Sequence, residues 1–457
     1  MSLRDVVKKI VPTKLFMSIE PAGHWAEAVV WNVVMGFPAK GLQVIGVTGT
    51  DGKTSTSALI AQMLRESGSK VAMMTTISID YGDGRGEIAN PTRLTTMGSR
   101  DLLQKIKKIK ANKVDYLILE TTSHALAQHR TWGVPYSIAV FTNLGHEHLD
   151  YHKTFERYRD AKRLLFKQTN KNKNGLRIGI INADDKVAEY FKKDIENSIT
   201  YGIQQGELLA TDIFMTPAGS SYSVRTGDTY YKIDCHVPGS FNVYNSLAAL
   251  GVGRALGLSK DQIENGIASL HEVEGRMTKV DEGQDFDVIV DYAHTPESFD
   301  KILAEVKKLT QGKLICAFGS AGRRDEAKRS EQGKIAGKWC DIVIATEEDD
   351  RDIDGLKILD QICDGAQESG KIMNKDLFSI LKREEAVKKA IDLAEKGDLV
   401  ILLGKGHEKS ILYNGPKAAE LRNLPQNDGD KQRVLKREYD EVSVAKSAIS
   451  LKMKNKS

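Results

Sequence analysis

Gly46-Val-Thr-Gly-Thr-Asp-Gly-Lys-Thr-Ser55 is the stretch of sequence that decides the fold. It ends a short apolar run that starts at Leu42, and it leads into residues 55–66, whose apolar side chains have helical spacing. Backbone N–H groups of a glycine-rich turn between a strand and a helix can hold phosphates. Lys53 would offset the charge of the outer phosphates, and the Thr54 hydroxyl would ligate Mg²⁺. Valine stands at position 47, where the strict P-loop spacing has glycine, but the context still favours a nucleotide loop over a structural turn.

The pattern outward from this loop predicts an α/β fold with two domains. Short apolar runs alternate with helical segments, interrupted at 200–237 by a polar stretch that favours a small antiparallel sheet. The alternation starts afresh after Gly275. We expect a P-loop central domain with a mostly parallel sheet, followed by a Rossmann-like α/β C-terminal domain. The expected boundaries are 1–41 for a short leader with an apolar helix, 42–270 for the central domain and 271–457 for the C-terminal domain.

Two local patterns give narrower expectations. Val71 to Ile79 is apolar and β-branched enough to be expected as one strand. Residues 415–437 are polar and charged, and we expect them to form a surface excursion.

The composition excludes several classes of protein. The 457 residues are 40% hydrophobic and 28% charged, and 66 Lys and Arg face 62 Asp and Glu, for a formal charge of +4. A collagen, a low-complexity polymer or a mostly disordered chain would differ from this. So small a basic excess gives no reason to expect nucleic-acid binding. The four cysteines lack zinc-site spacing, which argues against structural zinc and fits a reduced, cytoplasmic location.

The leader has a basic start and an apolar run from Trp25 to Phe37. This run is shorter than the roughly 18 residues of a membrane span, and no small-residue cleavage site follows it, so we expect no signal peptide. A helix docked on the central domain is the simpler interpretation. The alternative is an interfacial helix that gives residues 24–37 a peripheral membrane contact.

Acidic and histidine residues follow two of the expected strands. Glu120 ends the run Tyr116–Leu119, and His148 lies shortly after the run Ile138–Phe141. The carboxyl edge of an open α/β sheet is where ligands bind, so a carboxylate and an imidazole there can hold Mg²⁺ against phosphates. Taken alone, His148 could equally be a solvated loop histidine. No pattern distinguishes Lys162 from an exposed charge on a helix.

The loop T-G-T-D-G-K-T resembles that of the Mur ligase and folylpolyglutamate synthase superfamily, whose members are ATP-dependent amide-forming ligases. The wider chain, from about Leu42 onward, resembles the MurE branch, which adds the third amino acid to UDP-N-acetylmuramoyl-L-Ala-D-Glu. The motifs that carry this resemblance are GTDGKTS (49–55), LTT (94–96), ETTSHALAQHR (120–130), FTNLGHEHLDYH (141–152), YRDAKRLLF (158–166), INADD (181–185), PGSFNVYNSLAA (238–249), EGRM (274–277), VDYAHTPES (290–298), GRRDEAKR (322–329) and GKGHE (404–408).

The resemblance implies a role for each matching residue. The catalytic set would be Lys53, Glu120, His148 and Lys162. Two Mg²⁺ ions would be held by Thr54, Glu120, His148 and Lys162, the last as a carbamate. ATP would be held by Gly49, Thr50, Asp51, Gly52, Lys53, Thr54, Ser55, Asn143, Arg276 and Asp291. The muramoyl-dipeptide acceptor would contact Thr95, Thr96, Thr122, Gln128 and Arg130. The incoming amino acid would contact Arg324, Glu348, Asp349, Asp350, Arg351, Gly404 and Glu408.

The identity of the incoming amino acid depends on a short departure from the family pattern. Enzymes of this branch that use diaminopimelate carry D-N-P-R, and the matching residues here are Glu348-Asp349-Asp350-Arg351. The arginine suits a distal carboxylate, whereas the extra acids would favour the ammonium of lysine. We expect diaminopimelate, with lysine as the alternative. A third interpretation is that Arg351 simply pairs with these acids.

The resemblance also implies a mechanism and leaves alternatives. ATP would convert a carboxylate of the acceptor into an acyl phosphate, which the amine of the amino acid would attack. A UDP-binding domain stands in the family where this chain has about 41 residues. A folylpolyglutamate synthase, or another glutamate-polymer ligase, is therefore an alternative. A non-catalytic nucleotide-binding partner in a cell-wall complex is the alternative from another class. We expect small-molecule substrates and a monomer.

Overall fold

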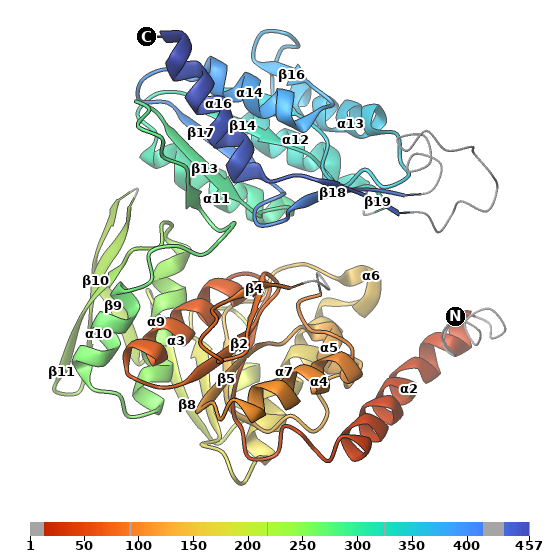
Figure 1. Cartoon of the computed structure of the whole chain (residues 1–457). Helices are drawn as coiled ribbons and strands as arrows, with labels where there is room; N and C mark the ends of the chain where they lie inside the picture. The colour runs from red at the N-terminus through yellow and green to blue at the C-terminus, as the bar shows by residue number, and fades with distance from the viewer. Residues whose placement is uncertain (1–12, 91–93, 217, 324–325, 415–433, 457) are drawn as a thin grey trace. The chain divides into compact units, whose positions relative to one another are not determined.

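The computed structural model describes residues 13–90, 94–216, 218–323, 326–414 and 434–456, so that Arg324 lies outside the described residues. The chain divides into two compact units, Met1–His271 and Glu272–Ser457. Each unit has its own sheet and its own hydrophobic core (Figure 1). Both sheets are mainly parallel with helices between successive strands, so the predicted α/β class is confirmed.

The described part of the first unit holds an 11-stranded sheet in the order β11-β10-β9-β8-β7-β6-β1-β5-β2-β3-β4. Its strands are β1 Gln43–Thr48, β2 Val71–Met74, β3 Ser78–Asp80, β4 Ile88–Ala89, β5 Tyr116–Glu120, β6 Tyr136–Phe141, β7 Ile178–Asn182, β8 Asn197–Gly202, β9 Leu208–Thr216, β10 Gly219–Thr226 and β11 Thr229–Cys235. Strands β2, β5, β1, β6, β7, β8 and β9 pair in parallel, and the strands at both edges pair antiparallel. The expected antiparallel excursion at 200–237 therefore corresponds to β9–β11.

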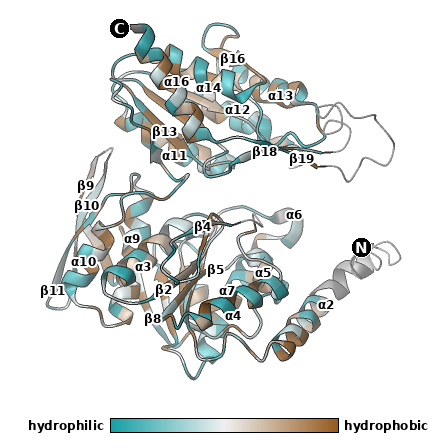
Figure 2. Cartoon of the chain, viewed as in Figure 1, coloured by the Kyte–Doolittle hydropathy of each residue, from teal (hydrophilic) through white to brown (hydrophobic). Residues whose placement is uncertain are grey.

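The helices of this unit are α2 Thr13–Val34, α3 Lys53–Glu66, α4 Ser99–Ala111, α5 Ser123–Ala127, α6 Leu149–His152, α7 Phe155–Lys171, α8 Ala188–Lys192, α9 Phe241–Ala255 and α10 Lys260–Ala268. Central strand β1 has five buried residues in succession, as expected for a parallel strand covered on both faces. Its neighbours are also coloured as hydrophobic in Figure 2. Strand β1 lies between β5 and β6, so the turns after these three strands meet at one edge of the sheet.

The expectation of a single strand over residues 71–79 is wrong. Strands β2 and β3 are separate and antiparallel, with Met74 opposite Ile79. The Thr75 hydroxyl accepts hydrogen bonds from the backbone N–H groups of Ile77 and Ser78, at 3.2 and 2.9 Å. Threonine can stabilise such a turn through its own side chain, and this local chemistry outweighs the apolar run.

The leader forms a longer helix than the apolar run predicted, because α2 starts at Thr13 and ends at Val34. Its C-terminal half lies against the rest of the first unit. Asn32 is fully buried and its Nδ2 donates to the backbone oxygen of Trp132 at 2.9 Å. The ring of Trp132 also meets the rings of Trp25 and Phe37, at centroid distances of 6.4 and 6.3 Å. The docked helix is thus the observed state. No helix in the described part of the chain is long and apolar enough to cross a membrane.

The second unit has a six-stranded sheet in the order β12-β13-β17-β14-β15-β16, which is parallel except for β12. Its strands are β12 Thr278–Lys279, β13 Asp287–Asp291, β14 Leu314–Phe318, β15 Ile342–Ala345, β16 Leu377–Ser379 and β17 Leu399–Leu403, with a separate pair β18 Ser410–Asn414 and β19 Val434–Glu438. Its helices are α11 Pro296–Leu309, α12 Ala327–Trp339, α13 Gly355–Glu368, α14 Arg383–Leu393 and α16 Glu441–Lys456.

The expected surface excursion at 415–437 needs a correction at its end. Residues 434–437 belong to β19, which pairs with β18 through five residue pairs from Ser410–Glu438 to Asn414–Val434. Alternating exposed and half-buried positions along β19 explain why its charged sequence resembled a loop. Residues 415–433 lie outside the described residues.

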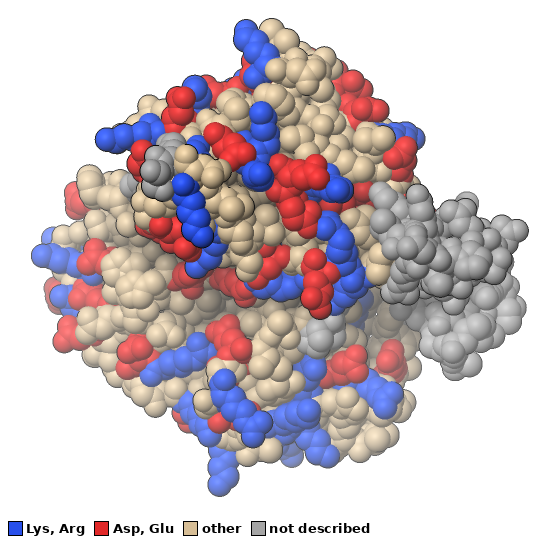
Figure 3. All heavy atoms as spheres, turned by 45° about the horizontal axis from the view of Figure 1, so that its top comes forward, with Lys and Arg blue, Asp and Glu red and all other residues tan. Residues whose placement is uncertain are grey.

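Charged side chains of both signs are interspersed on the face of the molecule drawn in Figure 3. This distribution agrees with the small net charge of +4.

Candidate active site

The turn between β1 and α3 is shaped by two glycines that tolerate no side chain. Gly52 has φ +80°, and a Cβ there would lie 2.4 Å from Oδ1 of Asn245 on α9. A Cβ on Gly49 would lie 1.8 Å from Oγ1 of Thr142. Close approach of neighbouring elements therefore requires glycine at both positions. The first intrahelical bond of α3 runs from the Thr56 N–H to the Gly52 oxygen at 2.9 Å. The backbone N–H groups before it are the ones that a helix start can offer to an anion.

Residues after β6 fix the other side of this turn. Asn143 Oδ1 accepts from the backbone N–H of Asp51 at 2.9 Å, and Asn143 Nδ2 donates to the Asp51 oxygen at 3.1 Å. Thr142 Oγ1 donates to the same oxygen at 2.6 Å. Lys53 Nζ folds back on the turn and donates to the oxygens of Gly49 and Thr50, at 3.1 and 2.7 Å. The sequence prediction that Asn143 belongs with the loop therefore has a geometric basis.

Glu120 is the last residue of β5 and has no exposed surface. Its Oε2 accepts from the backbone N–H and the hydroxyl of Thr76, at 3.1 and 2.8 Å. Its Oε1 is buried and has no hydrogen-bond partner among the described residues. An orphaned buried oxygen of this kind calls for a ligand, and the register of β1 and β5 pairs Glu120 with Val47, just before the phosphate turn.

Lys162 comes from α7 and is almost completely buried, with 2% of its surface exposed. Its Nζ donates to the Gly49 oxygen at 2.5 Å and lies 4.6 Å from the centre of the Tyr158 ring. Burial, together with the nearby Lys53 ammonium, holds the pKa of Lys162 well below its usual value. The structure therefore places an amine whose protonated form is disfavoured by burial next to the phosphate turn.

His148 has a positive φ of 56° and lies among other aromatic rings. Its ring centroid is 4.7 Å from that of His124 and 5.8 Å from that of Tyr158. The Tyr158 hydroxyl oxygen in turn lies 3.1 Å from the Thr50 hydroxyl oxygen. His148 therefore sits beside the phosphate turn, although 45% of its side chain is exposed.

The donor set fits Mg²⁺ only in combination with other oxygens. In the described parts of the chain, no group of three or more His, Cys, Asp or Glu residues could hold a metal ion by itself. Thr54, the unpartnered Glu120 Oε1 and His148 offer hard or borderline donors near the turn. Mg²⁺ commonly takes one or two protein ligands and completes its shell with phosphate oxygens and water, so the residues present are compatible with it.

The residues expected to contact the acceptor gather around Glu120. Thr96 Oγ1 donates to the Glu120 backbone oxygen at 3.0 Å and accepts from the Thr122 N–H at 3.1 Å. Arg130 donates through Nη1 to the Thr96 oxygen at 3.1 Å, and the hydroxyl oxygens of Thr95 and Thr76 lie 2.8 Å apart. Gln128 is 4% exposed, and its Oε1 has no partner among the described residues. The hydrogen bonds thus connect Thr95, Thr96, Thr122 and Arg130 around the end of β5, and Gln128 follows as the C-cap residue of α5.

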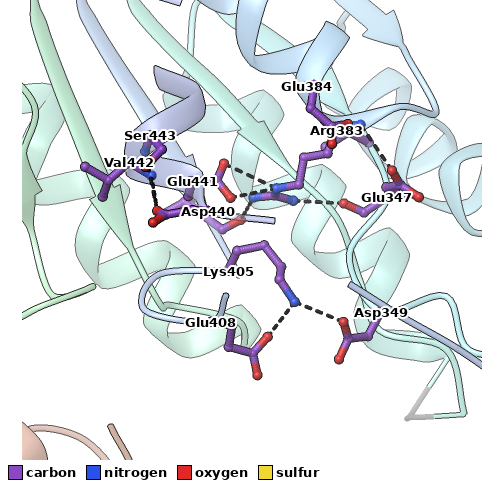
Figure 4. Close-up of polar contacts among 12 residues, drawn as sticks. Glu347, Asp349, Arg383, Glu384, Lys405, Glu408, Asp440, Glu441, Val442 and Ser443 are labelled. Carbon is purple, nitrogen blue, oxygen red and sulfur yellow. Dashed lines mark hydrogen bonds and ion pairs between the residues drawn. The ribbon is translucent and has the colours of Figure 1, made fainter. Parts of the chain in front are cut away.

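In the second unit, the turns after β15 and β17 are joined by a buried lysine, Lys405. Its Nζ lies 2.9 Å from Asp349 Oδ1 and 2.5 Å from Glu408 Oε2 (Figure 4). Lys405 has no exposed surface. It therefore neutralises two of the acids that the sequence assigned to the amino-acid pocket.

Three further predicted residues lie beside this turn. The Gly404 N–H donates to the Asp291 oxygen at 3.1 Å, and a Cβ on Gly404 would lie 3.0 Å from Glu348 Oε2. Burial raises the pKa values of Glu348 and Asp291. The Arg276 guanidinium lies 5.0 Å from the centre of the Tyr292 ring, next to Asp291 in sequence. The ends of the adjacent strands β13 and β17, and of β15 beyond β14, thus place Asp291, Gly404 and Glu348 at one edge of the sheet.

Arg351 is held by its backbone rather than by the acids before it. Its N–H donates to the Leu412 oxygen at 3.0 Å, and its oxygen accepts from Asn414 at 2.8 Å. The acids nearby have other cations, since Glu347 pairs with Arg437, Asp349 with Lys405 and Asp352 with Arg323. Arg351 makes no ion pair with Glu348, Asp349 or Asp350 among the described residues, but its charge adds to that of Arg323 in lowering the pKa of Asp352.

The sequence missed several residues that shape these sites. Asn245 contacts Gly52 and accepts from the Thr56 hydroxyl at 3.1 Å, Thr76 holds Glu120, and Tyr158 contacts Thr50. Arg383 bonds the Glu347 and Leu403 oxygens at 2.9 and 2.7 Å. Asn245, Tyr158 and Lys405 lie inside motifs that resemble the family, which was a usable signal. Thr76 and Arg383 carried no such signal.

Comparison with known proteins agrees with this arrangement. Residues 47–253 match the Mur ligase middle domain, and residues 275–406 match the Mur ligase glutamate ligase domain. A UDP-N-acetylmuramyl-tripeptide synthetase of Borreliella afzelii (strain PKo) is 39% identical over 390 residues, which cover 84% of this chain and 75% of that protein.

A UDP-N-acetylmuramoyl-L-alanyl-D-glutamate–2,6-diaminopimelate ligase of Bacillus velezensis (strain DSM 23117 / BGSC 10A6 / LMG 26770 / FZB42) is 40% identical over 387 residues, covering 84% of this chain and 77% of that protein. A solved structure of a ligase with the same name has a TM-score of 0.63 and 27% identity, and covers 95% of this chain and 83% of that one. The chain therefore belongs to the Mur ligase family.

Proposed function

We propose that this chain is an ATP-dependent ligase that adds an amino acid to a muramoyl-L-Ala-D-Glu-type acceptor in the synthesis of peptidoglycan precursors. The proposal rests on one cluster in the first unit. This cluster contains the phosphate turn, the Glu120 oxygen that has no partner among the described residues, and the buried Lys162. The acceptor-side residues Thr96, Thr122 and Arg130 surround Glu120 in the same unit. A nucleotide and a carboxylate acceptor would thus meet at one sheet edge.

The nucleotide would lie on the turn formed by residues 49–55. Lys53 would exchange its two carbonyl partners for the outer phosphates, since ammonium binds phosphate more strongly than a neutral oxygen. Mg²⁺, held by Thr54, Glu120 and His148 with a carbamate on Lys162, would offset the phosphate charge. The depressed pKa of Lys162 supports the carbamate, because only a neutral amine reacts with carbon dioxide.

Amide formation would then take two balanced steps. The acceptor carboxylate takes the γ-phosphoryl group, forming an acyl phosphate and releasing ADP. The amine nitrogen of the incoming amino acid forms a bond to the acyl carbon, the bond from that carbon to the phosphate oxygen breaks, and a proton leaves the nitrogen. Replacing Lys53 by alanine should abolish ADP formation, because it removes the cation at the turn. Wild-type turnover in Lys53→Ala would contradict the nucleotide assignment.

The charges around Arg351 favour diaminopimelate over lysine as the amino acid. Lys405 neutralises Asp349, which is one of the two extra acids, so Asp349 does not by itself create a free cation site. The Arg351 guanidinium would then bind the distal carboxylate. We propose diaminopimelate as the substrate.

Kinetics of Arg351→Ala test this choice. We expect the KM for diaminopimelate to rise about 10- to 100-fold, because a charged hydrogen-bond pair contributes about 1.5–3 kcal/mol. The KM for ATP serves as the internal control and should stay unchanged. Arg437→Ala would not serve as a control, because it would remove the ion-pair partner of the Glu347 carboxylate. A wild-type enzyme that uses lysine better than diaminopimelate would overturn the proposal that diaminopimelate is the substrate.

The alternatives make different predictions in the same assay. A folylpolyglutamate synthase would release ADP with folate and glutamate, and a non-catalytic partner would show no amino-acid-dependent ATPase activity. The two curated relatives above bear names of muramoyl-peptide ligases, which supports the cell-wall acceptor.

We further propose a monomer in the cytoplasm, where ATP and muramoyl precursors are available, with a peripheral membrane contact at residues 24–37. The four cysteines are free and buried, in keeping with a reducing location.

A further inference from the structure

We infer that helices α2 and α4 together form a docking surface for an anionic lipid bilayer. The surface combines exposed apolar side chains at the end of α2 with the basic side chains of α4. Peripheral binding of this kind needs both a buried apolar area and attraction to negative headgroups. The inference rests on and deepens the peripheral membrane contact proposed above for residues 24–37, and it does not depend on the ligase reaction.

The apolar part of the surface lies on the face of α2 that does not contact the protein. Ala28 and Asn32 are buried on one side of the helix, and Val30, Val33 and Val34 are 55%, 61% and 67% exposed on the other. Phe37, just after the helix, is 40% exposed. The end of α2 next to β1 is accordingly coloured as hydrophobic in Figure 2. A contiguous exposed apolar patch marks an interaction site, whereas single exposed side chains do not.

The basic part of the surface belongs to α4 and the residues that follow it. Leu102, Leu103, Ile106 and Ile109 are buried under the helix, which leaves its polar face outward. Over residues 99–113 there is one acid, Asp101, and there are six basic residues, Arg100, Lys105, Lys107, Lys108, Lys110 and Lys113. None of these six lysines and arginines has an ion pair among the described residues, so their charge is not cancelled locally.

Two contacts connect α4 with α2 and with the turn that follows α2. The Arg100 guanidinium lies 4.9 Å from the centre of the Trp31 ring of α2. Lys110 Nζ donates to the backbone oxygen of Lys40 at 2.7 Å. Residues 31–40 therefore follow α4 from its first turn to its last. The exposed apolar side chains of Val33, Val34 and Phe37 lie within this stretch, between the two contacts.

The charge pattern favours a lipid bilayer over other partners. A second copy of this chain would bring the same six basic residues toward themselves, which like-charge repulsion opposes. A membrane with anionic headgroups accepts the basic side chains and the apolar ones together, and each lysine near such a surface contributes about 1 kcal/mol, or about fivefold in affinity.

Vesicle sedimentation of the full chain tests the inference. Wild-type protein should sediment with vesicles of mixed phosphatidylglycerol and phosphatidylcholine and stay in solution with pure phosphatidylcholine, and added salt should release it. Val33→Ser/Val34→Ser should lower the partition coefficient several-fold. Lys107→Glu/Lys108→Glu should lower it about 25-fold or more. Both pairs are exposed, so the variants should fold and keep ligase activity on soluble substrates.

Matched controls carry the same changes elsewhere on the surface. Lys192→Glu/Lys193→Glu alters two exposed lysines at the end of α8, and Leu356→Ser/Ile372→Ser alters two exposed apolar residues of the second unit. These variants should bind vesicles better than the α2 and α4 variants.

Three outcomes would overturn the inference. The first is that the wild-type protein does not bind anionic vesicles. The second is that the α2 and α4 variants bind vesicles as strongly as the wild type. The third is that light scattering shows a dimer of the wild type that is absent in Val33→Ser/Val34→Ser. The last would assign the patch to a second copy. Ligase activity measured in parallel keeps this result separate from the proposed reaction.

Discussion

Lys162 is the residue whose environment is least favourable for the fold and most useful for the proposed chemistry. Its amine is buried 2.5 Å from the Gly49 oxygen, and its pKa lies well below the usual value because burial and Lys53 disfavour the charge. An amine in this state lowers stability at neutral pH, because the unfolded chain binds the proton more readily. Functional sites commonly carry such a stability cost.

Replacing Lys162 by methionine should therefore separate stability from activity. We expect Lys162→Met to lose most ligase activity and not to regain it with bicarbonate, while the free energy of unfolding rises by about 1 kcal/mol at pH 7. Because the pKa of Lys162 is lowered in the folded state, this gain should fade as the pH rises through about 10.4, where unfolded lysine also becomes neutral. Denaturant unfolding of both proteins at several pH values, without bicarbonate, measures this difference in the free energy of unfolding. A variant less stable than wild type throughout would show that the Gly49 contact outweighs burial.

Gly49 makes a second prediction at the residue scale. A Cβ at this position would overlap Thr142 Oγ1, at 1.8 Å, so Gly49→Ala must displace either the turn or the strand end after β6. We expect nucleotide binding to weaken at least tenfold in equilibrium titration with an ATP analogue. Gly68→Ala is the matched control, because it also has a positive φ, of 91°, but nothing lies within 4 Å of its Cβ. Equal nucleotide affinity in both variants would contradict the packing account.

The sequence was informative about site residues where chemistry restricts the residue type. The turn at 46–55 and Glu120 at a strand end could be predicted, because phosphate binding requires backbone N–H groups and carboxylates at that edge have few structural uses. Thr76 could not, because its contact with Glu120 depends on a turn that the apolar pattern concealed. The proposed roles of all these residues remain predictions.

At the scale of elements, the ends of β15 and β17 and the start of α16 are held together by one buried arginine. Arg383, at the start of α14, has no exposed surface, and its Nε lies 2.8 Å from Glu441 Oε2 (Figure 4). Burial alone would lower the pKa of Arg383, but the Glu441 carboxylate more than offsets this, so the pKa is raised. The Arg383 guanidinium therefore stays charged, and its other hydrogen bonds fix the turns that carry Glu348 and Gly404.

Breaking this pair should destabilise the second unit. We expect Glu441→Gln to lower the free energy of unfolding by about 3 kcal/mol, because it leaves the Arg383 charge buried without a counter-charge. Lys301→Met is the control, because it removes one partner of an exposed pair with Glu297 on α11 and should cost less than about 1 kcal/mol. Denaturant unfolding of both variants checks this. Equal effects would mean that the buried pair contributes no more than a surface pair.

The sequence predicted elements best where one signal dominated. The sequence predicts helices over 242–256 and 356–368. The observed α9 is shifted by one residue toward the N-terminus, and α13 begins one residue earlier than predicted. Strands β2 and β3 were merged, because the hydroxyl chemistry of Thr75 leaves no mark on an apolar pattern. Strand β19 was missed since its residues are mostly exposed and charged.

At the scale of the whole molecule, the two units have separate cores. One core cluster gathers on the first sheet and another on the second. Multi-domain chains of this kind commonly depart from two-state unfolding. We expect calorimetry to resolve two transitions, and ATP at about 100 times its Kd to stabilise the first unit by about 2.7 kcal/mol. A single transition that shifts as a whole with ATP would show that the units unfold together.

Membership of the Mur ligase family sets the whole molecule's reaction class, while the acceptor and the amino acid rest on the proposal. The chain spans about three-quarters of the length of the curated relatives it matches. The motifs that carry the family resemblance all lie after residues 1–41 and therefore give no information about this part of the chain. The structure assigns α2 to the first unit rather than to a body of its own.

The most direct test of the central claim is ADP release by the purified full chain with UDP-N-acetylmuramoyl-L-Ala-D-Glu and either diaminopimelate, lysine or glutamate. We predict ADP release that requires both the muramoyl acceptor and diaminopimelate, with formation of the amide product detected by mass spectrometry. ADP release only with folate and glutamate, or no release that depends on an amino acid, would contradict the account.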